Sequence, residues 1–322
     1  MIQENLVKFS ITIPAYKAKF LKKCIDSILC QTYDNFEVIV LNDASPEPID
    51  EIIAGYDDQR IFYYKNDNNV GAEKVVDNWN KCLDYATGDY IICMGDDDML
   101  MPDCLQEYYS WIRDYPEIDV FHCRSYIIND EGEKVSLTPS WAKHESVWDN
   151  IWHRVYDYRD HFIGDYLYKR IALVENGKFY YLPMAWASDD ITSYIVMREK
   201  GVMHIDSPLF CYRRNDMTIS NTGNVEIKLK AIEGEELWYE HFMVTYMPEK
   251  GIDRVLFDSI QNELPHYFKI KRLKTVAYFG YGKGLLRSFF HWLKRQREIK
   301  LSKAEVVYAT ILAAKDKMAH KK

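Results

Sequence analysis

Three consecutive aspartates, Asp96–Asp98, are the residues of this sequence whose type and spacing most clearly suggest chemistry. At an effective dielectric near 20, two carboxylates about 4 Å apart repel each other by roughly 4 kcal/mol. Such a cluster is therefore either solvated or neutralised by a cation. Carboxylate oxygens suit hard ions such as Mg²⁺ or Mn²⁺, whose coordination is commonly completed by a substrate's phosphates. A solvated acidic turn before a helix that starts near Pro102 is the alternative, and the residues alone leave both open.

The elements before the aspartates determine where they lie. Short apolar runs alternate with segments whose apolar residues recur every three or four positions, which indicates alternating strands and helices. Strands are expected at 9–14, 36–41, 61–64 and 90–94, and helices at 19–31, 47–55 and 75–86. This order predicts an α/β fold with a mostly parallel sheet, where ligands bind at the carboxyl ends of the strands. Asp43 and Asp96–Asp98 come directly after two of these strands.

The pattern changes after residue 118. Residues 119–128 and 133–137 are typical of an antiparallel hairpin. Aromatic residues concentrate between 141 and 168, and beyond Asn224 the sequence is mainly helical. We therefore expect a catalytic α/β domain over 1–223 and a helical, basic C-terminal extension over 224–322.

Charge is distributed unevenly along the chain. The formal net charge is −8, yet residues 266–322 hold 15 lysines and arginines against three acids. The acidic body argues against a nucleic-acid partner, whereas the basic tail predicts an anionic one. The seven cysteines form no Cys-x-x-Cys pair, which favours a reduced, cytoplasmic setting. Neither a signal peptide nor a run of about 18 apolar residues is present, so we expect a soluble or peripheral protein.

Four segments together resemble a known family. Gly88-Asp-Tyr90-Ile-Ile, followed by Gly95-Asp-Asp-Asp98-Met-Leu-Met-Pro102-Asp103, resembles the strand and DxD-type metal motif of the inverting family 2 glycosyltransferases, which have the GT-A fold. Ile11–Tyr16 is similar to the first strand and nucleotide-contacting turn of that family. Val40–Ser45 is similar to its second strand, and Asn69-Val-Gly71 to its "N-x-G". The resemblance covers about residues 8 to 220.

The resemblance implies a site for a nucleotide-diphospho-sugar, with a UDP-sugar favoured. A pyrimidine edge carries an N–H donor, which the Asp43 carboxylate is suited to accept; a helix-cap or turn role is the alternative for Asp43. The residues implied to bind the donor nucleotide are Pro14, Ala15, Tyr16, Asp43, Asn69, Gly71, Asp96, Arg213 and Arg214.

The same resemblance implies a metal and a base. Asp97 aligns best with the metal ligand of the family, and Asp96 and Asp98 are further candidate ligands for Mn²⁺ or Mg²⁺, which would neutralise the diphosphate leaving group. Ser188-Asp189-Asp190-Ile191 resembles the "ED" catalytic motif. This implies Asp190 as the general base for an acceptor hydroxyl and Asp189 as a residue that orients it. Acids that favour a helix N-terminus are the alternative.

The segment from Leu209 to Ser220 resembles the "YRxHxxS" loop that covers the diphosphate in this family. Asn215 replaces the expected histidine and is a poorer metal ligand. Arg213 or Arg214 would contact phosphate, unless they form surface ion pairs. A second departure is Asp77, where many members have arginine.

Aromatic rings after the hairpin are candidates for acceptor binding. Trp148, Trp152 or Tyr156 could pack on the C–H face of a sugar, although ordinary core packing is the alternative. His144, His153 and His161 show no metal-ligand spacing and are expected to be structural or exposed.

The C-terminal tail contains an amphipathic segment. Its apolar residues are Leu285, Leu286, Phe289, Phe290 and Leu293, with Trp292 near the boundary, and its cations are Arg287, Lys294, Arg295, Arg297 and Lys300. This composition is typical of an interfacial helix on an anionic membrane. A helix packed on the catalytic domain is the alternative.

These observations predict a metal-dependent, inverting glycosyltransferase of the hexosyltransferase class. It would transfer a sugar to a hydroxyl of a glycan or lipid-linked acceptor, in surface-polysaccharide assembly at the inner face of the cell membrane. A catalytically inactive nucleotide-sugar or glycan-binding protein is one alternative. A sugar-nucleotide pyrophosphorylase is another, but Ile13–Tyr16 lacks the glycine-rich, basic loop that such an enzyme needs.

Overall fold

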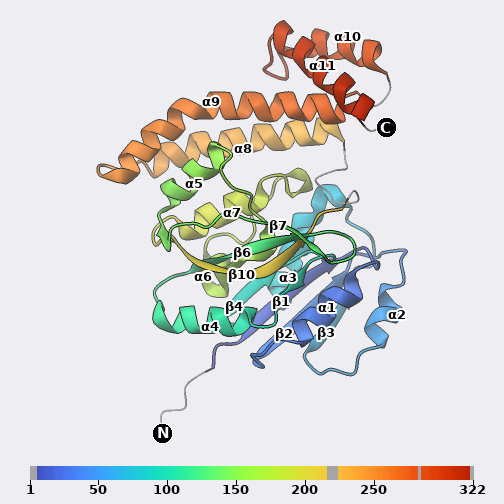
Figure 1. Cartoon of the computed structure of the whole chain (residues 1–322), viewed down its shortest axis with the longest axis vertical. Coiled ribbons are helices and arrows are strands. Elements are labelled where there is room, and N and C mark those ends of the chain that lie inside the picture. Colours follow the sequence, from blue (N-terminus) through green and yellow to red (C-terminus); the bar gives the residue numbers. More distant parts are fainter. Residues whose placement is uncertain (1–5, 216–223, 282–283, 320–322) are drawn as a thin grey trace. The chain divides into compact units, whose positions relative to one another are not determined.

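The computed structural model describes residues 6–215, 224–281 and 284–319, and the chain divides into two compact units (Figure 1). The first unit comprises the described residues of Met1–Tyr181 and Ser188–Thr218. The second comprises those of Leu182–Ala187 and Ile219–Lys322. Leu182–Ala187 thus belongs to the second unit although the residues on both sides of it belong to the first. The domain boundary at 223/224 stays a prediction.

The first unit is built on a mixed sheet, which has ten strands in the described residues. The strands are β1 (Phe9–Ala15), β2 (Phe36–Asn42), β3 (Ile61–Lys65), β4 (Tyr90–Cys93), β5 (Met99–Leu100), β6 (Val120–Ile128), β7 (Lys134–Leu137), β8 (His144–Glu145), β9 (Tyr166–Lys169) and β10 (Val202–Arg213). Their order is β3-β2-β1-β4-β9-β6-β10-β5, with β7 beside β6 and β8 beside β10. Parallel pairing holds for β3-β2-β1-β4 and for β6 with β10, and the other pairs are antiparallel.

Helices surround this sheet in the first unit (Figure 1). They are α1 (Leu21–Leu29), α2 (Ile49–Ala54), α3 (Val75–Tyr85), α4 (Cys104–Asp114), α5 (Val147–Val155), α6 (Arg170–Glu175) and α7 (Ser188–Met197), with 3₁₀ turns at Ala72–Lys74 and Ile163–Asp165. Strands β1, β2 and β4 are almost wholly buried and mainly apolar, as expected for parallel strands covered on both faces. Ile11 pairs with Val38 on one side and with Ile92 on the other, so the carboxyl ends of these three strands lie at one edge.

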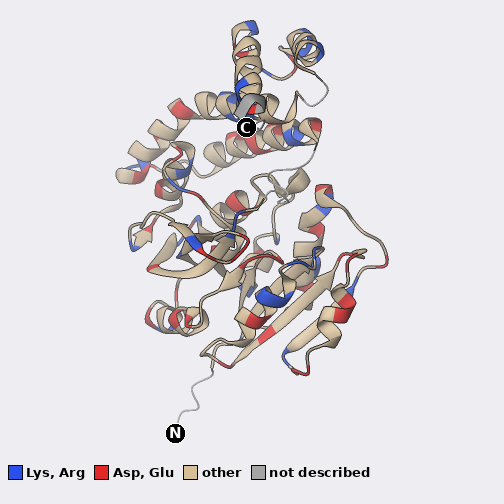
Figure 2. Ribbon diagram, turned by 45° about the vertical axis from the view of Figure 1, so that its right-hand side comes forward, with Lys and Arg blue, Asp and Glu red and all other residues tan. Residues whose placement is uncertain are grey.

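The second unit is helical. It contains the 3₁₀ turn Pro183–Ala185 and helices α8 (Val225–Thr245), α9 (Ile252–Phe279), α10 (Leu285–Arg295) and α11 (Lys303–Ala319). Helices α8 and α9 lie side by side, and both carry acidic as well as basic residues (Figure 2). A separate apolar core joins α9, α10 and α11 through Val276, Trp292, Val306, Ala309 and Ala313.

The predicted α/β fold and helical C-terminal region are confirmed. The sheet is mixed, with four parallel and five antiparallel strand pairs in the described residues. The sequence did not indicate β5 and β8, which are two residues long and exist because β10 pairs with them. Among the described residues, no helix combines the length and the apolar character needed to cross a membrane.

Candidate active site

The turn after β1 is hydrogen-bonded to the aspartate motif that follows β4. Asp96 Oδ2 accepts hydrogen bonds of 2.7 Å from the backbone N–H groups of both Tyr16 and Lys17. Burial raises the pKa of Asp96 to about 6. Ala15 is buried, Pro14 is half-buried and the Tyr16 ring is 41% exposed, so the turn predicted to contact the nucleotide presents its tyrosine outward.

Asp98 turns inward from the same motif. It is buried, and its carboxylate accepts hydrogen bonds from the backbone N–H groups of Gly95 and Arg213. Burial, with the charge of Asp97 second, raises the pKa of Asp98 well above its ordinary value. A Cβ on Gly95 would lie 2.9 Å from carboxylate oxygens of Asp97 and Asp98, so a larger residue there would force these carboxylates to shift. Asp98 therefore shapes the turn, and the metal-ligand role of Asp98 stays a prediction.

Arg213 holds this turn in place by hydrogen bonds to backbone carbonyl oxygens. Its side chain is fully buried, its Nε donates to the carbonyl oxygen of Asp97 at 2.7 Å, and its Nη1 donates to the carbonyl oxygens of Asn129 and Asp130. The phosphate contact predicted for Arg213 is therefore corrected to a structural role. Arg214 is exposed, so a phosphate contact stays a prediction for this neighbour alone.

Asp97 is half-buried and faces the residue that departs from the family pattern. Asn215 Nδ2 donates a hydrogen bond of 2.7 Å to Asp97 Oδ2. Oδ1 of Asp96 and Oδ1 of Asp97 have no hydrogen-bond partner among the described residues. Two unsatisfied carboxylate oxygens are the donors that Mg²⁺ and Mn²⁺ prefer, so these residues fit the implied metal. Ser220, at the end of the predicted covering loop, lies outside the described residues.

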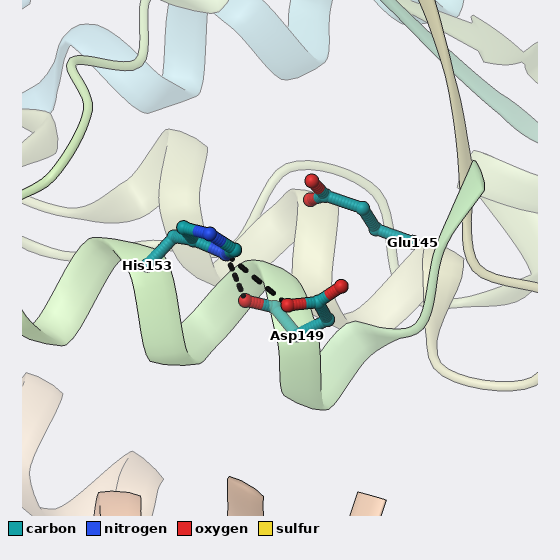
Figure 3. A group of neighbouring side chains, drawn as sticks. All are labelled: Glu145, Asp149 and His153. Atoms are coloured by element: carbon teal, nitrogen blue, oxygen red, sulfur yellow. Dashed lines mark hydrogen bonds and ion pairs between the residues drawn. The ribbon is translucent and has the colours of Figure 1, made fainter. Parts of the chain in front are cut away.

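A second group of possible metal ligands comes from the end of β8 and from α5. Oxygen or nitrogen atoms of Glu145, Asp149 and His153 lie within 4.8 Å of one another, although the sequence did not predict a metal-ligand role for His153 (Figure 3). Both Glu145 oxygens accept hydrogen bonds from Arg159, which neutralises this carboxylate. The side chain of His153 contacts the carbonyl and carboxylate of Asp149 in its own helix. This group is therefore a weaker cation site than the aspartate motif.

Asp43 lies at the carboxyl end of β2, held by a polar network that the sequence did not reveal. Its Oδ1 accepts hydrogen bonds from Asn66 Nδ2 (2.8 Å) and the backbone N–H of Val70 (3.0 Å). Asn66 also contacts Asn78 and Lys81. Oδ2 of Asp43 has no hydrogen-bond partner among the described residues and is available to a ligand N–H. Helix α2 begins after Pro48, so Asp43 does not cap it.

The predicted "N-x-G" segment lies next to Asp43. Asn69 is exposed, and Gly71 has a φ of 80°, a conformation that favours glycine. Together they carry the chain past Asp43 into the turn that precedes α3. Asp77, which replaces the usual arginine, is exposed at the first turn of α3.

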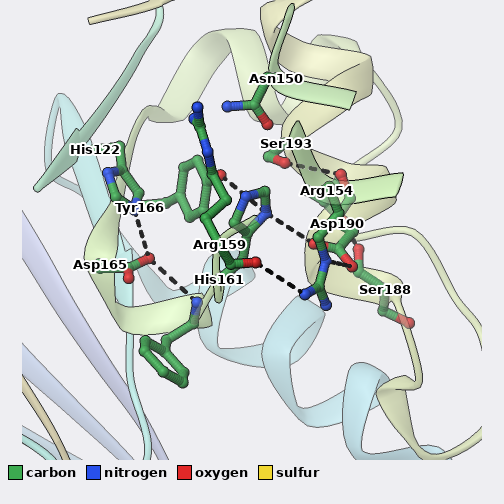
Figure 4. A network of polar contacts seen from close by, with 12 residues as sticks. His122, Asn150, Arg154, Arg159, His161, Asp165, Tyr166, Ser188, Asp190 and Ser193 are labelled. Carbon is green, nitrogen blue, oxygen red and sulfur yellow. Dashed lines mark hydrogen bonds and ion pairs between the residues drawn. The ribbon is translucent and has the colours of Figure 1, made fainter. Parts of the chain in front are cut away.

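The predicted catalytic acids form the first turn of α7. Asp190 is 3% exposed; Arg154 Nε donates to its Oδ2 at 3.1 Å, and His161 Nδ1 lies 2.9 Å from its Oδ1 (Figure 4). Asp189 is half-buried, and burial, with the charge of Asp190 second, raises the pKa of Asp189 to about 7. His161, expected to be merely structural or exposed, instead contacts the predicted base. No sequence pattern indicates this contact, which joins residues 29 positions apart.

The chain enters α7 through strained backbone. Met184, Ala185 and Ala187 have φ values of 60°, 54° and 72°. Residues with a Cβ pay about 1–2 kcal/mol for this left-handed region, and such strain clusters at functional sites.

A buried polar cluster continues from His161 toward β6 (Figure 4). His122 lies 3.3 Å from Asp165 and 2.9 Å from His204, and the Trp141 ring stacks on His122. Burial lowers the pKa of His122 well below its ordinary value and raises the pKa of Asp165 to about 8. Ser125 donates a hydrogen bond to Asp165 at 2.9 Å.

The candidate acceptor aromatics divide between core and surface. Trp148 is 4% exposed, so the acceptor contact predicted for it is corrected to core packing. Trp152 and Tyr156 are half-buried and pack with the exposed Tyr158. An acceptor contact stays a prediction for Trp152 and Tyr156.

The mixed sheet flanked by helices, with Asp43 and Asp96–Asp98 after the parallel strands β2 and β4, has the architecture of the GT-A class of nucleotide-sugar transferases. The family described as glycosyl transferase family 2 matches residues 10–176, just over half of the chain, and the chain belongs to this family. Glycosyltransferase GlyA of Streptococcus pneumoniae serotype 4 is 30% identical over 149 residues, which are 45% of this chain and 20% of that protein. The uncharacterized glycosyltransferase MJ1057 of Methanocaldococcus jannaschii is 32% identical over 117 residues, or 35% of this chain and 39% of the other.

Solved structures match over more of the chain. TarS 1-349 of S. aureus in complex with UDP-GlcNAc covers 97% of this chain, with 92% of its own length, a TM-score of 0.66 and 15% identity. TarS 1-349 in complex with UDP matches with a TM-score of 0.60. These matches confirm the GT-A fold. The chain spans only a fifth to two fifths of the length of the two curated relatives above.

Proposed function

We propose that this protein is a metal-dependent, inverting glycosyltransferase that takes a sugar from a nucleotide-diphospho-sugar. The observation that carries the proposal is the pair of hydrogen bonds between the turn after β1 and Asp96. These bonds hold the turn proposed to bind the nucleotide next to the aspartate motif. Asp43 belongs to the same edge, since its backbone N–H donates to Ala15.

A UDP-sugar is the donor that we propose. Asp43 Oδ2 accepts the ring N–H of uracil, and Asn66 and Val70 orient the carboxylate by holding its other oxygen. The structural neighbour TarS has been solved with UDP-GlcNAc and with UDP, which supports this choice of nucleotide. Arg214 is the exposed cation available for the diphosphate.

Asp97 and Asp96 would hold Mn²⁺ or Mg²⁺ through their unpartnered oxygens. A bound ion would supply Lewis-acid stabilisation of the diphosphate as the leaving group departs. Asp98, Gly95 and Arg213 keep the turn in the shape that presents these oxygens.

Asp190 removes the proton from the acceptor hydroxyl, which attacks the anomeric carbon from the face opposite the diphosphate and inverts the configuration. Arg154 favours the ionised, proton-accepting form of this carboxylate, and His161 fixes its orientation. Asp189 lies at the same helix terminus and orients the acceptor. The acceptor is a glycan or lipid-linked hydroxyl, with Trp152 and Tyr156 as its aromatic contacts.

Turnover of a panel of nucleotide-sugars with Mn²⁺ tests this proposal. Wild-type protein should hydrolyse at least one donor or transfer its sugar, and so should the control Asp57→Ala, which changes an exposed aspartate. Asp97→Ala and Asp190→Ala should do neither. Donor binding without turnover on every donor and acceptor tried would favour the inactive binding protein instead.

A further inference from the structure

Helix α10 has more apolar surface than its unit covers. Ser288 and Trp292 face inward and are buried, and Leu285, Phe289 and Leu293 pack partly against the apolar core of α9, α10 and α11. Leu286 and Phe290, one helical turn apart, remain 76% and 57% exposed. The apolar stripe predicted from sequence is therefore split into a packed part and an outward part.

Helix α11 shows the same division. Val306, Ala309 and Ala313 are buried in that core. Val307, Tyr308 and Ile311 lie on the opposite side of the helix and are 45%, 52% and 47% exposed. Two consecutive helices thus each present an apolar face outward.

The basic residues of the tail also fall into two groups, those paired with acids and those without an ion pair in the described residues. Arg295 pairs with Glu226 and Glu298, and Lys300 pairs with Glu236, so these two basic groups are neutralised within the unit. Arg287 and Lys294, which flank Leu286 and Phe290, are exposed and form no ion pair among the described residues.

The same holds on α11. Lys303 and Lys315 are exposed at the two ends of its outward apolar face and have no ion pair within the described ranges. Glu305 is the acid nearest to Lys303 in sequence, and it lies within 3.8 Å of Lys269 instead. The outward faces therefore combine apolar side chains with uncompensated positive charge.

We infer that the outward faces of α10 and α11 bind the surface of an anionic lipid bilayer. Apolar side chains enter the boundary between headgroups and acyl chains, while flanking lysines and arginines attract anionic headgroups. A bilayer is favoured over a protein partner because the unpaired charge on these faces is of one sign. The structure also limits the membrane-binding surface, because Trp292 is buried and because Arg295 and Lys300 are paired with acids of the same unit. This inference does not depend on the proposed transferase activity.

Vesicle flotation of the full chain tests the inference. The protein should float with vesicles of phosphatidylcholine and phosphatidylglycerol, but at least tenfold less with phosphatidylcholine alone or at high salt. Leu286→Ser/Phe290→Ser and, separately, Arg287→Gln/Lys294→Gln should each reduce flotation severalfold. Ile252→Ser/Val255→Ser is the matched control, because these residues of α9 are 71% and 63% exposed and the neighbouring Arg254 is paired with Asp258.

The outcomes of this experiment either support membrane binding by α10 and α11 or overturn it. Equal flotation of the wild type and both α10 variants, or absence of wild-type flotation at low salt, would overturn the inference. Sedimentation velocity without lipid should show the same species for all four proteins. Self-association that only the α10 variants abolish would assign these faces to a second copy of the chain. Thermal melting should give the same midpoint for all variants, since each substituted side chain is exposed or half-buried at the surface.

Discussion

Arg154 and Asp190 form an ion pair at the first turn of α7, with Arg154 Nε 3.1 Å from Asp190 Oδ2. His161 occupies the other carboxylate oxygen, so both oxygens of the proposed base contact a nitrogen donor. The Asp190 side chain is 4% exposed, whereas Arg154 is 25% exposed and open to solvent on one side.

Replacing Arg154 with Gln should move the acidic limb of the pH–rate profile to higher pH. Loss of the guanidinium removes a positive charge that favours the ionised carboxylate. Initial rates of sugar transfer from pH 5 to 9 measure the shift. Arg60→Gln, at a surface arginine paired with Asp58, should leave the profile unchanged. An identical profile for Arg154→Gln would remove Arg154 from the catalytic arrangement.

Asp190→Asn should lower kcat by about 10²–10⁴-fold, as expected for loss of a general base. Asp189→Asn should lower it by about tenfold, because Asp189 acts on orientation rather than on the proton. Single-turnover rates on a reactive acceptor measure both. The reverse ranking would assign the base to Asp189, whose half-buried carboxyl has a pKa raised to about 7 by burial.

Arg213→Met should destabilise the protein by about 3 kcal/mol, because the carbonyl oxygens of Asp97 and Asn129 lose their charged donor. Urea unfolding measures the change. The adjacent Arg214→Met should leave stability within about 0.5 kcal/mol and raise the KM for the donor instead. Unchanged stability of Arg213→Met would restore Arg213 to the list of phosphate contacts.

Asn215→His should strengthen Mn²⁺ binding, because imidazole nitrogen is a better ligand than an amide. Asn215 already contacts Asp97 Oδ2, so a histidine in its place starts beside the proposed metal ligand. Mn²⁺ titration followed by electron paramagnetic resonance measures the dissociation constant, with Asn215→Ala as the matched control. Equal Mn²⁺ affinity in all three proteins would place the ion elsewhere.

Asp165 should make stability fall as pH rises from 7 to 9. Burial raises the folded-state pKa of Asp165 to about 8, against about 3.9 in the unfolded chain, so the folded state holds an additional proton at pH 7 and loses it as the pH rises through 8. The decline should therefore be steepest between pH 7 and 8 and should level off toward pH 9. The neighbouring His122 and His161, whose pKa values burial lowers, have their effect at more acidic pH.

Urea unfolding at pH 7, 8 and 9 tests this expectation. Asp165→Asn keeps the acceptor for Ser125 and removes the charge, so its unfolding free energy should decline less over the same range. Parallel declines in the two proteins would contradict it.

The sequence predicted those elements whose local residue pattern matches their burial in the folded protein. Strands β1, β2 and β4 are apolar because both faces are buried, so their composition marks them, and the acids after them follow. The two-residue strands β5 and β8 are determined by their pairing with β10, which no local pattern encodes. The contacts of Arg213 with the aspartate turn and of His161 with Asp190 were not predicted, for a related reason. Their roles depend on partners more than 25 residues away, Asp97 and Asp190.

The short segment Leu182–Ala187 makes simple truncation an unsuitable experiment for this chain. Trp186 packs at its edge against Phe279, and Lys228 lies over the Trp186 ring, all within the helical unit. A protein ending at residue 223 would expose this segment to water and free the strained backbone at Met184–Ala187, one peptide bond before α7. If the truncated protein were inactive, the cause could then be a changed backbone at the start of α7, which carries Asp189 and Asp190. The result would not show that the missing helices themselves are needed for activity. Point substitutions on α10 and α11 leave this tether intact.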